Sequence, residues 1–183
     1  MSKDLDKDEF GLIETTYGKA SQSHSVYFND EVVDIDKYHS FMHLLRTATD
    51  KDNITLILQN YGGSCHTCLA IGNLMRACKA NIDVEVIAPC YSAGTTIALA
   101  GDSLVLHNHT FLMFHDYSGG YSGKGNEIKL HVEATEKFIR GYMKEFHMPF
   151  LTLNEHKSMV AGMDLYIHAS DRDIKKRIKR HFR

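Results

Sequence analysis

Ser92 stands in a sequence context that could make its hydroxyl group a nucleophile. Residues 84–88 form a short apolar run rich in β-branched side chains, which predicts a buried strand. Pro89 is expected to end that strand, because proline cannot donate to a sheet ladder. Residues 95–100 are small and apolar and predict a buried helix. Ser92 would then lie in a strand-to-helix turn, as in a nucleophile elbow, although only Gly94 of the two glycines in the G-x-S-x-G pattern is present. The alternative is that Ser92 only caps the helix.

Two further groups follow predicted strands. Gly62 and Gly63 come after an apolar run at residues 54–58 and would let a ligand approach the main chain closely. His115 ends another predicted strand and could act as a general base. Ligands bind at the carboxyl edge of parallel sheets, so these groups and Ser92 are expected at one edge. A carboxylate would be needed to hold the imidazole tautomer. The spacing leaves four candidates open: Asp102, Asp116, Asp164 and Asp171.

The elements that must position these groups alternate along the chain. Strands are expected at residues 25–28, 54–58 and 84–88, each followed by a helix. Such an order implies right-handed crossovers and a largely parallel, buried sheet, which is an α/β fold. Later elements are expected as follows: strands at 103–107 and 110–115, a long amphipathic helix from Asn126 that Pro149 ends, a short helix at 152–161 and a short strand near 165–167.

The composition excludes several classes of protein. A chain of 183 residues suits one domain with a substantial core. Apolar residues make up 43% and charged residues 24%, so the chain is neither disordered nor membranous. No apolar run approaches the ~20 residues of a membrane span. The formal net charge of −2 creates no global field for nucleic acid. We therefore expect neither a membrane nor a nucleic acid as a partner.

The cysteines and the N-terminus favour a cytoplasmic protein. The first residues are charged and lack the apolar segment of a secretory signal. Four cysteines in a chain of this length do not make a disulfide framework, so a reducing cytosol is expected. Cys65 and Cys68 form a C-x-x-C pair, but a structural zinc site needs a second ligand pair. We expect packed free thiols there and neither a metal nor another cofactor.

Both ends of the chain differ in composition from the middle. Residues 1–20 are expected to form a mobile N-terminal arm. Residues 171–183 carry seven lysines or arginines and predict a basic C-terminal helix. A solvated helix face is the simplest interpretation of that charge, and binding to a polyanion or a membrane surface is the alternative.

Four motifs in the chain resemble the Clp protease proteolytic subunit family, serine peptidases of the crotonase-like superfold. The resemblance runs from about residue 26 to residue 173. It rests on four segments: Gly62-Gly63-Ser64 resembles the family's P-G-G-S loop, Tyr91-Ser92-Ala93-Gly94 its A-S-M-G turn, Phe114-His115 with residues 119–123 its histidine strand and G-G-x-x-G segment, and Met163-Asp164-Leu165-Tyr166 its R-D-R-F segment.

The resemblance implies a role for each matched residue. Ser92 would be the nucleophile, His115 the general base and Asp164 the carboxylate of a catalytic triad. The backbone N–H groups of Gly63 and Ala93 would form the oxyanion hole. The implied substrate is a peptide or unfolded protein, and no cofactor is needed. The implied assembly is a homo-oligomer of stacked rings, in which residues 119–148 form a handle, and an ATP-dependent unfoldase is a further implied partner.

The sequence also departs from the family. Tyr61 stands where the family usually has proline, and Ala93 replaces the usual methionine. The N-terminal helix that helps to dock the unfoldase in the family is expected to be missing or much reduced here. Such divergence resembles phage-encoded or accessory Clp-like peptidases, including head-maturation proteases. Two other functions are alternatives: a crotonase-type acyl-CoA enzyme, which would not need the triad, and an inactive Clp-like scaffold. A Ser–Lys peptidase is disfavoured, because no lysine occupies a matching position.

Overall fold

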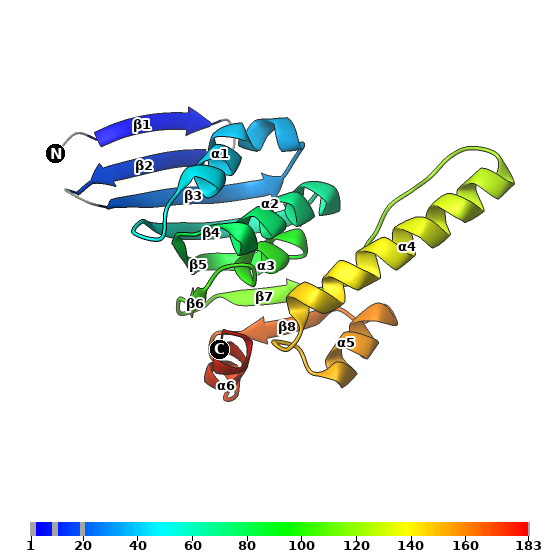
Figure 1. The fold of residues 1–183 in the computed structure, drawn as a ribbon. Coiled ribbons are helices and arrows are strands. Elements are labelled where there is room, and N and C mark those ends of the chain that lie inside the picture. Colours follow the sequence, from blue (N-terminus) through cyan, green and yellow to red (C-terminus); the bar gives the residue numbers. More distant parts are fainter. Residues whose placement is uncertain (1–2, 9–10, 19–20, 183) are drawn as a thin grey trace.

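The computed structural model describes residues 3–8, 11–18 and 21–182 (Figure 1). In this part of the chain, eight strands form one sheet in the order β1-β2-β3-β4-β5-β7-β8, with β6 also paired to β5. The pairs β3–β4, β4–β5, β5–β6 and β5–β7 are parallel. The pairs at the two edges of the sheet, β1–β2, β2–β3 and β7–β8, are antiparallel. The strands are β1 Lys3–Asp8, β2 Gly11–Tyr17, β3 Gln22–Val32, β4 Asn53–Gly63, β5 Asn81–Tyr91, β6 Ser103–Leu106, β7 Phe111–Phe114 and β8 Leu165–His168. The predicted α/β fold class with a mainly parallel sheet is confirmed.

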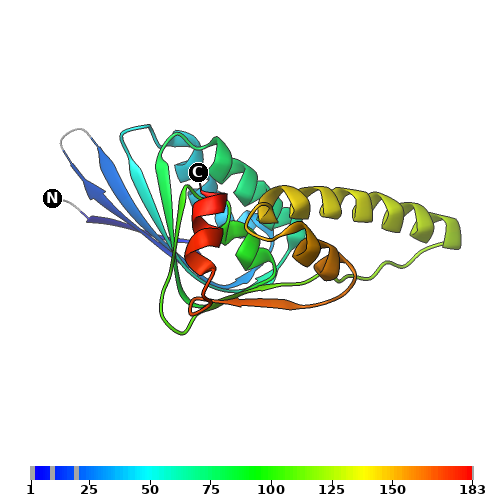
Figure 2. The same ribbon diagram turned by 90° about the horizontal axis from the view of Figure 1, so that it is seen from below.

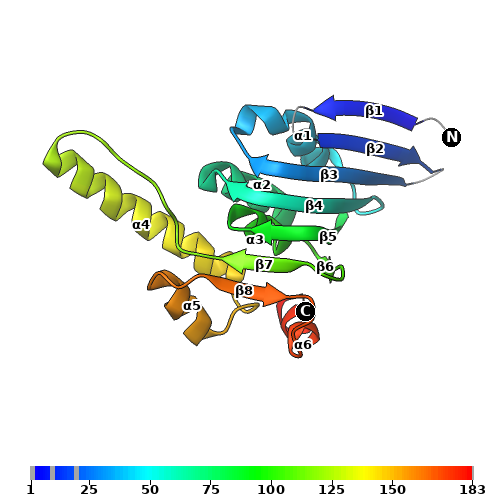
Figure 3. The same ribbon diagram turned by 180° about the vertical axis from the view of Figure 1, so that it is seen from behind.

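Three helices cover one face of the sheet, as Figure 2 shows. They are α1 (His39–Thr47), α2 (Cys65–Ala77) and α3 (Ala93–Ala98), and a short 3₁₀ turn (Ile35–Tyr38) precedes the first. Burial along β4 alternates: Ile54, Leu56 and Leu58 are fully buried under these helices. Figure 3 shows the opposite face with no helix of the described chain over it. Tyr61 and Tyr166 are exposed there, so the sheet is buried on one side only, not on both as expected.

Strands β4 and β5 extend further than the sequence predicts. β5 continues through Pro89 to Tyr91, so the prediction that Pro89 ends the strand is wrong. The ladder between β4 and β5 shifts register at this point: Leu58 is opposite Val86, but Asn60 is opposite Cys90. Pro89 lies within that irregularity, where no ladder N–H is required of it. β4 likewise continues through the glycine pair to Gly63.

The N-terminal residues join the sheet in the structure. Within the arm expected at residues 1–20, β1 pairs with β2, and β2 pairs with β3. The sequence predicted only an arm here and not this pairing. Residues 1–2, 9–10 and 19–20 of that arm lie outside the described residues.

The segment expected as a handle, residues 119–148, projects from the body in Figure 1. It consists of an irregular chain that follows His115 and of α4, Gly125–His147. The rings of Tyr121 and His131 stack with their centroids 3.6 Å apart and hold the two parts together. The C-terminal half of α4 buries Ile139, Tyr142, Met143 and Phe146 against the body. Leu130 and Val132 in its N-terminal half are exposed.

Helices α5 (Leu153–Val160) and α6 (Ile174–His181) complete the described chain. α6 lies within the basic tail expected at residues 171–183, as predicted. Arg177 donates two hydrogen bonds, of 2.9 and 2.7 Å, to the carboxylate of Glu155 on α5, and Arg180 donates one of 2.6 Å to the carbonyl of Phe150. Two of its basic residues therefore attach the helix to the body instead of facing solvent. None of the helices in the described chain combines the length and apolarity needed to cross a membrane.

Candidate active site

Ser92 occupies a strained turn between β5 and α3. Its backbone has φ 53° and ψ −121°, a region that non-glycine residues rarely adopt. Three hydrogen bonds fix the turn: the Ser92 N–H donates to the Met113 carbonyl at 2.8 Å, and the N–H and hydroxyl of Thr95 donate to the Ser92 carbonyl at 2.9 and 2.6 Å. The Ser92 side chain makes no helix-capping hydrogen bond. The alternative that Ser92 only caps the helix is therefore not what the structure shows.

The hydroxyl of Ser92 is directed at His115. Its Oγ atom lies 2.6 Å from Nε2 of His115, within hydrogen-bonding distance. The sheet explains this proximity, because Tyr91 of β5 is paired with Met113 of β7, and Ser92 and His115 follow these strands at the same edge. The pair therefore has the geometry of a hydroxyl group and a base that can accept its proton.

Gly62 and Gly63 end β4 beside this pair. A Cβ atom on Gly62 would lie 2.7 Å from Cβ of Ser92, and one on Gly63 would overlap the Val32 carbonyl oxygen, so neither position accommodates a side chain. Both have positive φ, 93° and 132°. Ala93 is the first residue of α3, so its N–H has no helical carbonyl partner. The structure thus places the two predicted oxyanion donors on segments that flank Ser92.

The backbone of Asp164 lies next to that of His115, but its side chain does not contact the imidazole. β8 pairs antiparallel with β7, with Phe114 opposite Leu165, and continuing this register by one residue puts Asp164 opposite His115. The Asp164 side chain is exposed, and in the described part of the chain no hydrogen bond joins it to His115. The structure therefore brings two of the three predicted triad side chains together.

The other three carboxylates have different partners. Asp102 accepts a hydrogen bond from the Ile82 N–H at 2.8 Å, near the start of β5 and away from Ser92. Asp171 accepts one from the His168 N–H at 2.9 Å. Asp116 forms an ion pair with Arg140 at 3.4 Å. Of the four candidates, Asp164 is the one whose strand register faces His115.

Sequence reasoning missed Asn60. This residue is fully buried, and its Oδ1 accepts a hydrogen bond of 2.8 Å from the Gly62 N–H. It also lies against Gly94, where a Cβ atom would come within 2.7 Å of Oδ1. One signal in the sequence could have found it: Asn60 interrupts, just before the glycine pair, the alternation of apolar residues on the buried face of β4.

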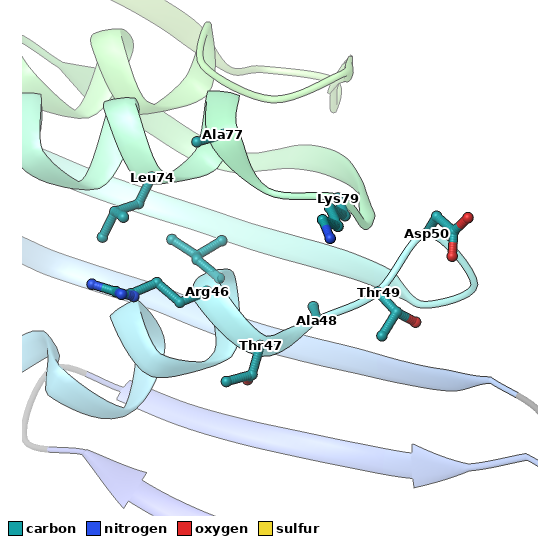
Figure 4. Close-up of a pocket in the computed structure, with 9 residues that line it drawn as sticks. Arg46, Thr47, Ala48, Thr49, Asp50, Leu74, Ala77 and Lys79 are labelled. Atoms are coloured by element: carbon teal, nitrogen blue, oxygen red, sulfur yellow. The ribbon is translucent and has the colours of Figure 1, made fainter.

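A cleft runs from Gly63 toward the projecting segment. Its volume is about 470 Å³, and its walls come from residues 63–66 on one side and from residues 117–121 and α4 on the other. A larger hollow of about 760 Å³ lies elsewhere, between the ends of α1 and α2, and includes Arg46, Asp50 and Lys79 (Figure 4). That hollow is at the amino edge of the parallel strands, opposite to Ser92. A small cavity of about 10 Å³ is lined by Ser92 and His115 themselves, and the cleft beside Gly63 shares Cys65 and Tyr117 with it.

Cys65 and Cys68 both belong to α2: Cys65 lines the cleft, and Cys68 lies behind it. Cys68 is fully buried, and its thiol donates to the Ala93 carbonyl at 3.2 Å. Burial raises the pKa of the Cys68 thiol, which disfavours the thiolate that a metal or a redox reaction would need. Among the described residues, no group of three or more His, Cys, Asp or Glu side chains is arranged to hold a metal ion. Cys68 has the environment of a packed thiol.

The family model described as Clp protease matches residues 8–158. The matched range contains Gly63, Ser92, His115 and the whole of α4, and it ends before Asp164.

Proposed function

The chain belongs to the Clp protease family, and we propose that it is a serine endopeptidase with Ser92, His115 and Asp164 as its catalytic groups. Family membership supports a peptidase function. The assignment of Ser92 and His115 as catalytic groups is supported by the 2.6 Å contact between Ser92 Oγ and His115 Nε2. Ser92 makes this contact from a strained strand-to-helix turn. An acyl-CoA enzyme of the crotonase class would have no use for this pair.

The proposed reaction starts with attack by Ser92 on the scissile carbonyl. Nε2 of His115 takes the hydroxyl proton as the C–O bond forms. The carbonyl oxygen becomes an oxyanion, which the N–H groups of Gly63 and Ala93 would bind; each such donor typically contributes ~3 kcal/mol to the transition state. The C–N bond then breaks, and His115 gives its proton to the leaving amine. Water releases the acyl group by the same steps in reverse.

Asp164 is assigned the role of orienting His115. The strand register places it opposite His115, so a rotation of its exposed side chain would bring the carboxylate toward Nδ1. A carboxylate in that position favours the tautomer with Nε2 free to accept the Ser92 proton.

The proposed substrate is an extended peptide or an unfolded protein. The cleft of about 470 Å³ begins at Gly63, one of the proposed oxyanion donors, and continues along the segment that enters α4. Clp proteases generally act on peptides and form oligomeric rings. We propose the same assembly here, with stacked rings enclosing the active sites. The family also suggests an ATP-dependent unfoldase as a partner and phage head maturation as an alternative role.

A fluorophosphonate probe tests the assignment of Ser92. The wild-type chain should be labelled on Ser92 and should hydrolyse small peptide esters. Ser92→Ala should abolish labelling and leave less than ~1% of the hydrolysis, because loss of a triad nucleophile usually lowers the rate by several orders of magnitude. His115→Ala should behave in the same way while the protein still folds.

The matched control is Ser122→Ala, which removes an exposed serine from the projecting segment. Labelling and hydrolysis should persist in this variant. Labelling that survives Ser92→Ala would exclude the nucleophile assignment. A wild-type chain that takes no label under conditions in which it is assembled would favour the inactive scaffold or the acyl-CoA enzyme.

A further inference from the structure

Asn60 is a buried polar side chain on a face of β4 that is otherwise apolar. Ile54, Leu56 and Leu58 precede it at two-residue intervals, and all four residues have no exposed surface. The Nδ2 atom of Asn60 is buried and finds no hydrogen-bond partner in the described part of the chain. Buried donors without partners are rare and destabilising in native proteins. Packing alone therefore does not explain why an amide stands here.

The carboxamide joins the two segments on either side of Ser92. On one side, Oδ1 accepts the hydrogen bond of 2.8 Å from the Gly62 N–H. On the other side, a Cβ atom on Gly94 would lie 2.7 Å from Oδ1 and 2.9 Å from Cβ of Asn60. Asn60 is also opposite Cys90 where the ladder resumes after its register shift. A single side chain thus touches both the glycine pair and the turn that carries the nucleophile.

This contact fixes which N–H of the glycine pair remains available. The Gly62 N–H is committed to Asn60, so it cannot serve an oxyanion. The next peptide unit carries the Gly63 N–H, and its direction depends on the conformation at Gly62. Gly62 has φ 93° and touches Ser92, so a rotation there would move the Gly63 donor relative to Oγ of Ser92.

We propose that Asn60 is a positioning residue that sets the separation and direction of the two oxyanion donors. The inference rests on the proposed serine peptidase function and deepens it. Asn60 itself touches no substrate, since it is buried beneath the glycine pair. Its effect is exerted through Gly63 on one segment and Ala93 on the other.

The test compares Asn60→Leu with the wild type. Leucine keeps the branched shape but cannot accept the Gly62 hydrogen bond. We expect kcat for a peptide ester to fall by about 10- to 100-fold, with KM within about threefold, because an oxyanion donor acts mainly in the transition state. The affinity for a peptide aldehyde, which forms a tetrahedral adduct with Ser92, should fall by a similar factor. Binding of the corresponding product carboxylate peptide should change less than threefold.

Thermal unfolding separates positioning from a structural role. Asn60→Leu removes the unpaired Nδ2 donor but also takes the acceptor from the buried Gly62 N–H, so the two effects offset and the unfolding temperature should stay within a few degrees of the wild type. Gln59→Met is the matched control: it makes a comparable change in the preceding residue, which is half-buried on the opposite face of β4. It should leave kcat, aldehyde affinity and unfolding temperature unchanged. Asn60→Ala, which adds no methyl groups near Gly94, repeats the measurement if the leucine variant does not fold.

Each outcome decides between the interpretations. Aldehyde affinity and kcat within threefold of the wild type in both Asn60 variants would overturn the inference. A parallel loss of kcat, product binding and stability would also overturn it, because that pattern describes a structural residue. A wild-type chain that shows no Ser92-dependent hydrolysis would instead overturn the proposed function, which the wild-type sample reveals before any Asn60 variant is measured.

Discussion

At the scale of single residues, the site depends on backbone conformations as much as on side chains. Ser92, Gly62 and Gly63 all have positive φ, and the first is a non-glycine residue held there by neighbouring hydrogen bonds. Such conformations persist only where the surroundings over-determine them, and they are common at active sites. The strain at Ser92 directs its hydroxyl to His115 and leaves α3 without a side-chain cap.

A prediction at this scale concerns Asp164. If its carboxylate orients His115, then Asp164→Asn should lower kcat for peptide ester hydrolysis by about 10²- to 10⁴-fold, because the imidazole loses its tautomer control. KM should change little, since Asp164 does not line the cleft beside Gly63. Steady-state kinetics on assembled protein provide the measurement.

Asp116→Asn is the control for Asp164→Asn. Asp116 is adjacent to His115 in sequence but pairs with Arg140, so its loss should change kcat by less than about threefold. If the two variants exchange these effects, Asp116 is the third member of the triad and the assignment of Asp164 is wrong.

The residue types and spacings predicted Ser92, His115 and the glycine pair, because each follows a strand at one edge of a parallel sheet. The same reasoning could not choose among four aspartates, since β8 reaches β7 only through α4 and α5, and sequence spacing does not fix that register. Asn60 was missed for a similar reason: its role comes from a contact with Gly94, 34 residues away in sequence, which only the β4–β5 register creates.

At the scale of elements, periodicity predicted the order of strands and helices but not where the strands end. Pro89 was expected to stop β5, yet the strand continues because the ladder with β4 is already irregular there. Tertiary pairing overrides local propensity at such positions. The boundaries predicted for the short helix at residues 152–161 were closer: α5 spans Leu153–Val160, and Thr152 caps it by accepting from the Glu155 N–H.

The contact between α3 and α4 leads to a prediction about pH. His147 at the end of α4 is buried, and its Nε2 lies 2.9 Å from the Thr96 hydroxyl of α3. Burial and the neighbouring His156 and His181 lower the pKa of His147 to about 3. In the unfolded chain, His147 has a pKa of about 6.5 and becomes protonated below that pH, whereas in the native protein it stays neutral. The free energy of unfolding therefore falls as the pH drops from about 6.5 toward 3.

The expected size of this effect is about 2 kcal/mol between pH 7 and pH 4.5. Urea unfolding at the two pH values should show that His147→Gln loses less stability on acidification than the wild type by this amount, whatever its stability at pH 7. His43→Gln, which removes an exposed histidine, should leave the loss unchanged. An equal loss in wild type and His147→Gln would show that other groups control the acid sensitivity.

At the scale of the whole molecule, the described chain leaves two regions without a covering layer. The open face of the sheet exposes Tyr61 and Tyr166, and the N-terminal half of α4 exposes Leu130 and Val132. Leu130 is 65% exposed, whereas Ile139 on the packed half of the same helix is 4% exposed. Exposed apolar groups gathered on a projecting element are typical of an interface between chains. Clp proteases generally form oligomeric rings, and the ring assembly proposed for this chain would provide such an interface.

The last prediction couples assembly to activity through the segment that precedes α4. This segment begins directly after His115 and is held to α4 by the Tyr121–His131 stack, so displacement of α4 should also displace His115. Ile128→Glu with Val132→Glu puts two charges on the uncovered half of the helix. We expect stacked rings to separate into single rings or smaller species, and peptide hydrolysis to fall by at least tenfold in the same samples. Sedimentation velocity and hydrolysis assays measure the two effects together. Lys137→Glu, an exposed position on the same helix, changes the net charge by the same two units and should leave both unchanged. A fully active species of 20.8 kDa would show that the active site does not depend on assembly.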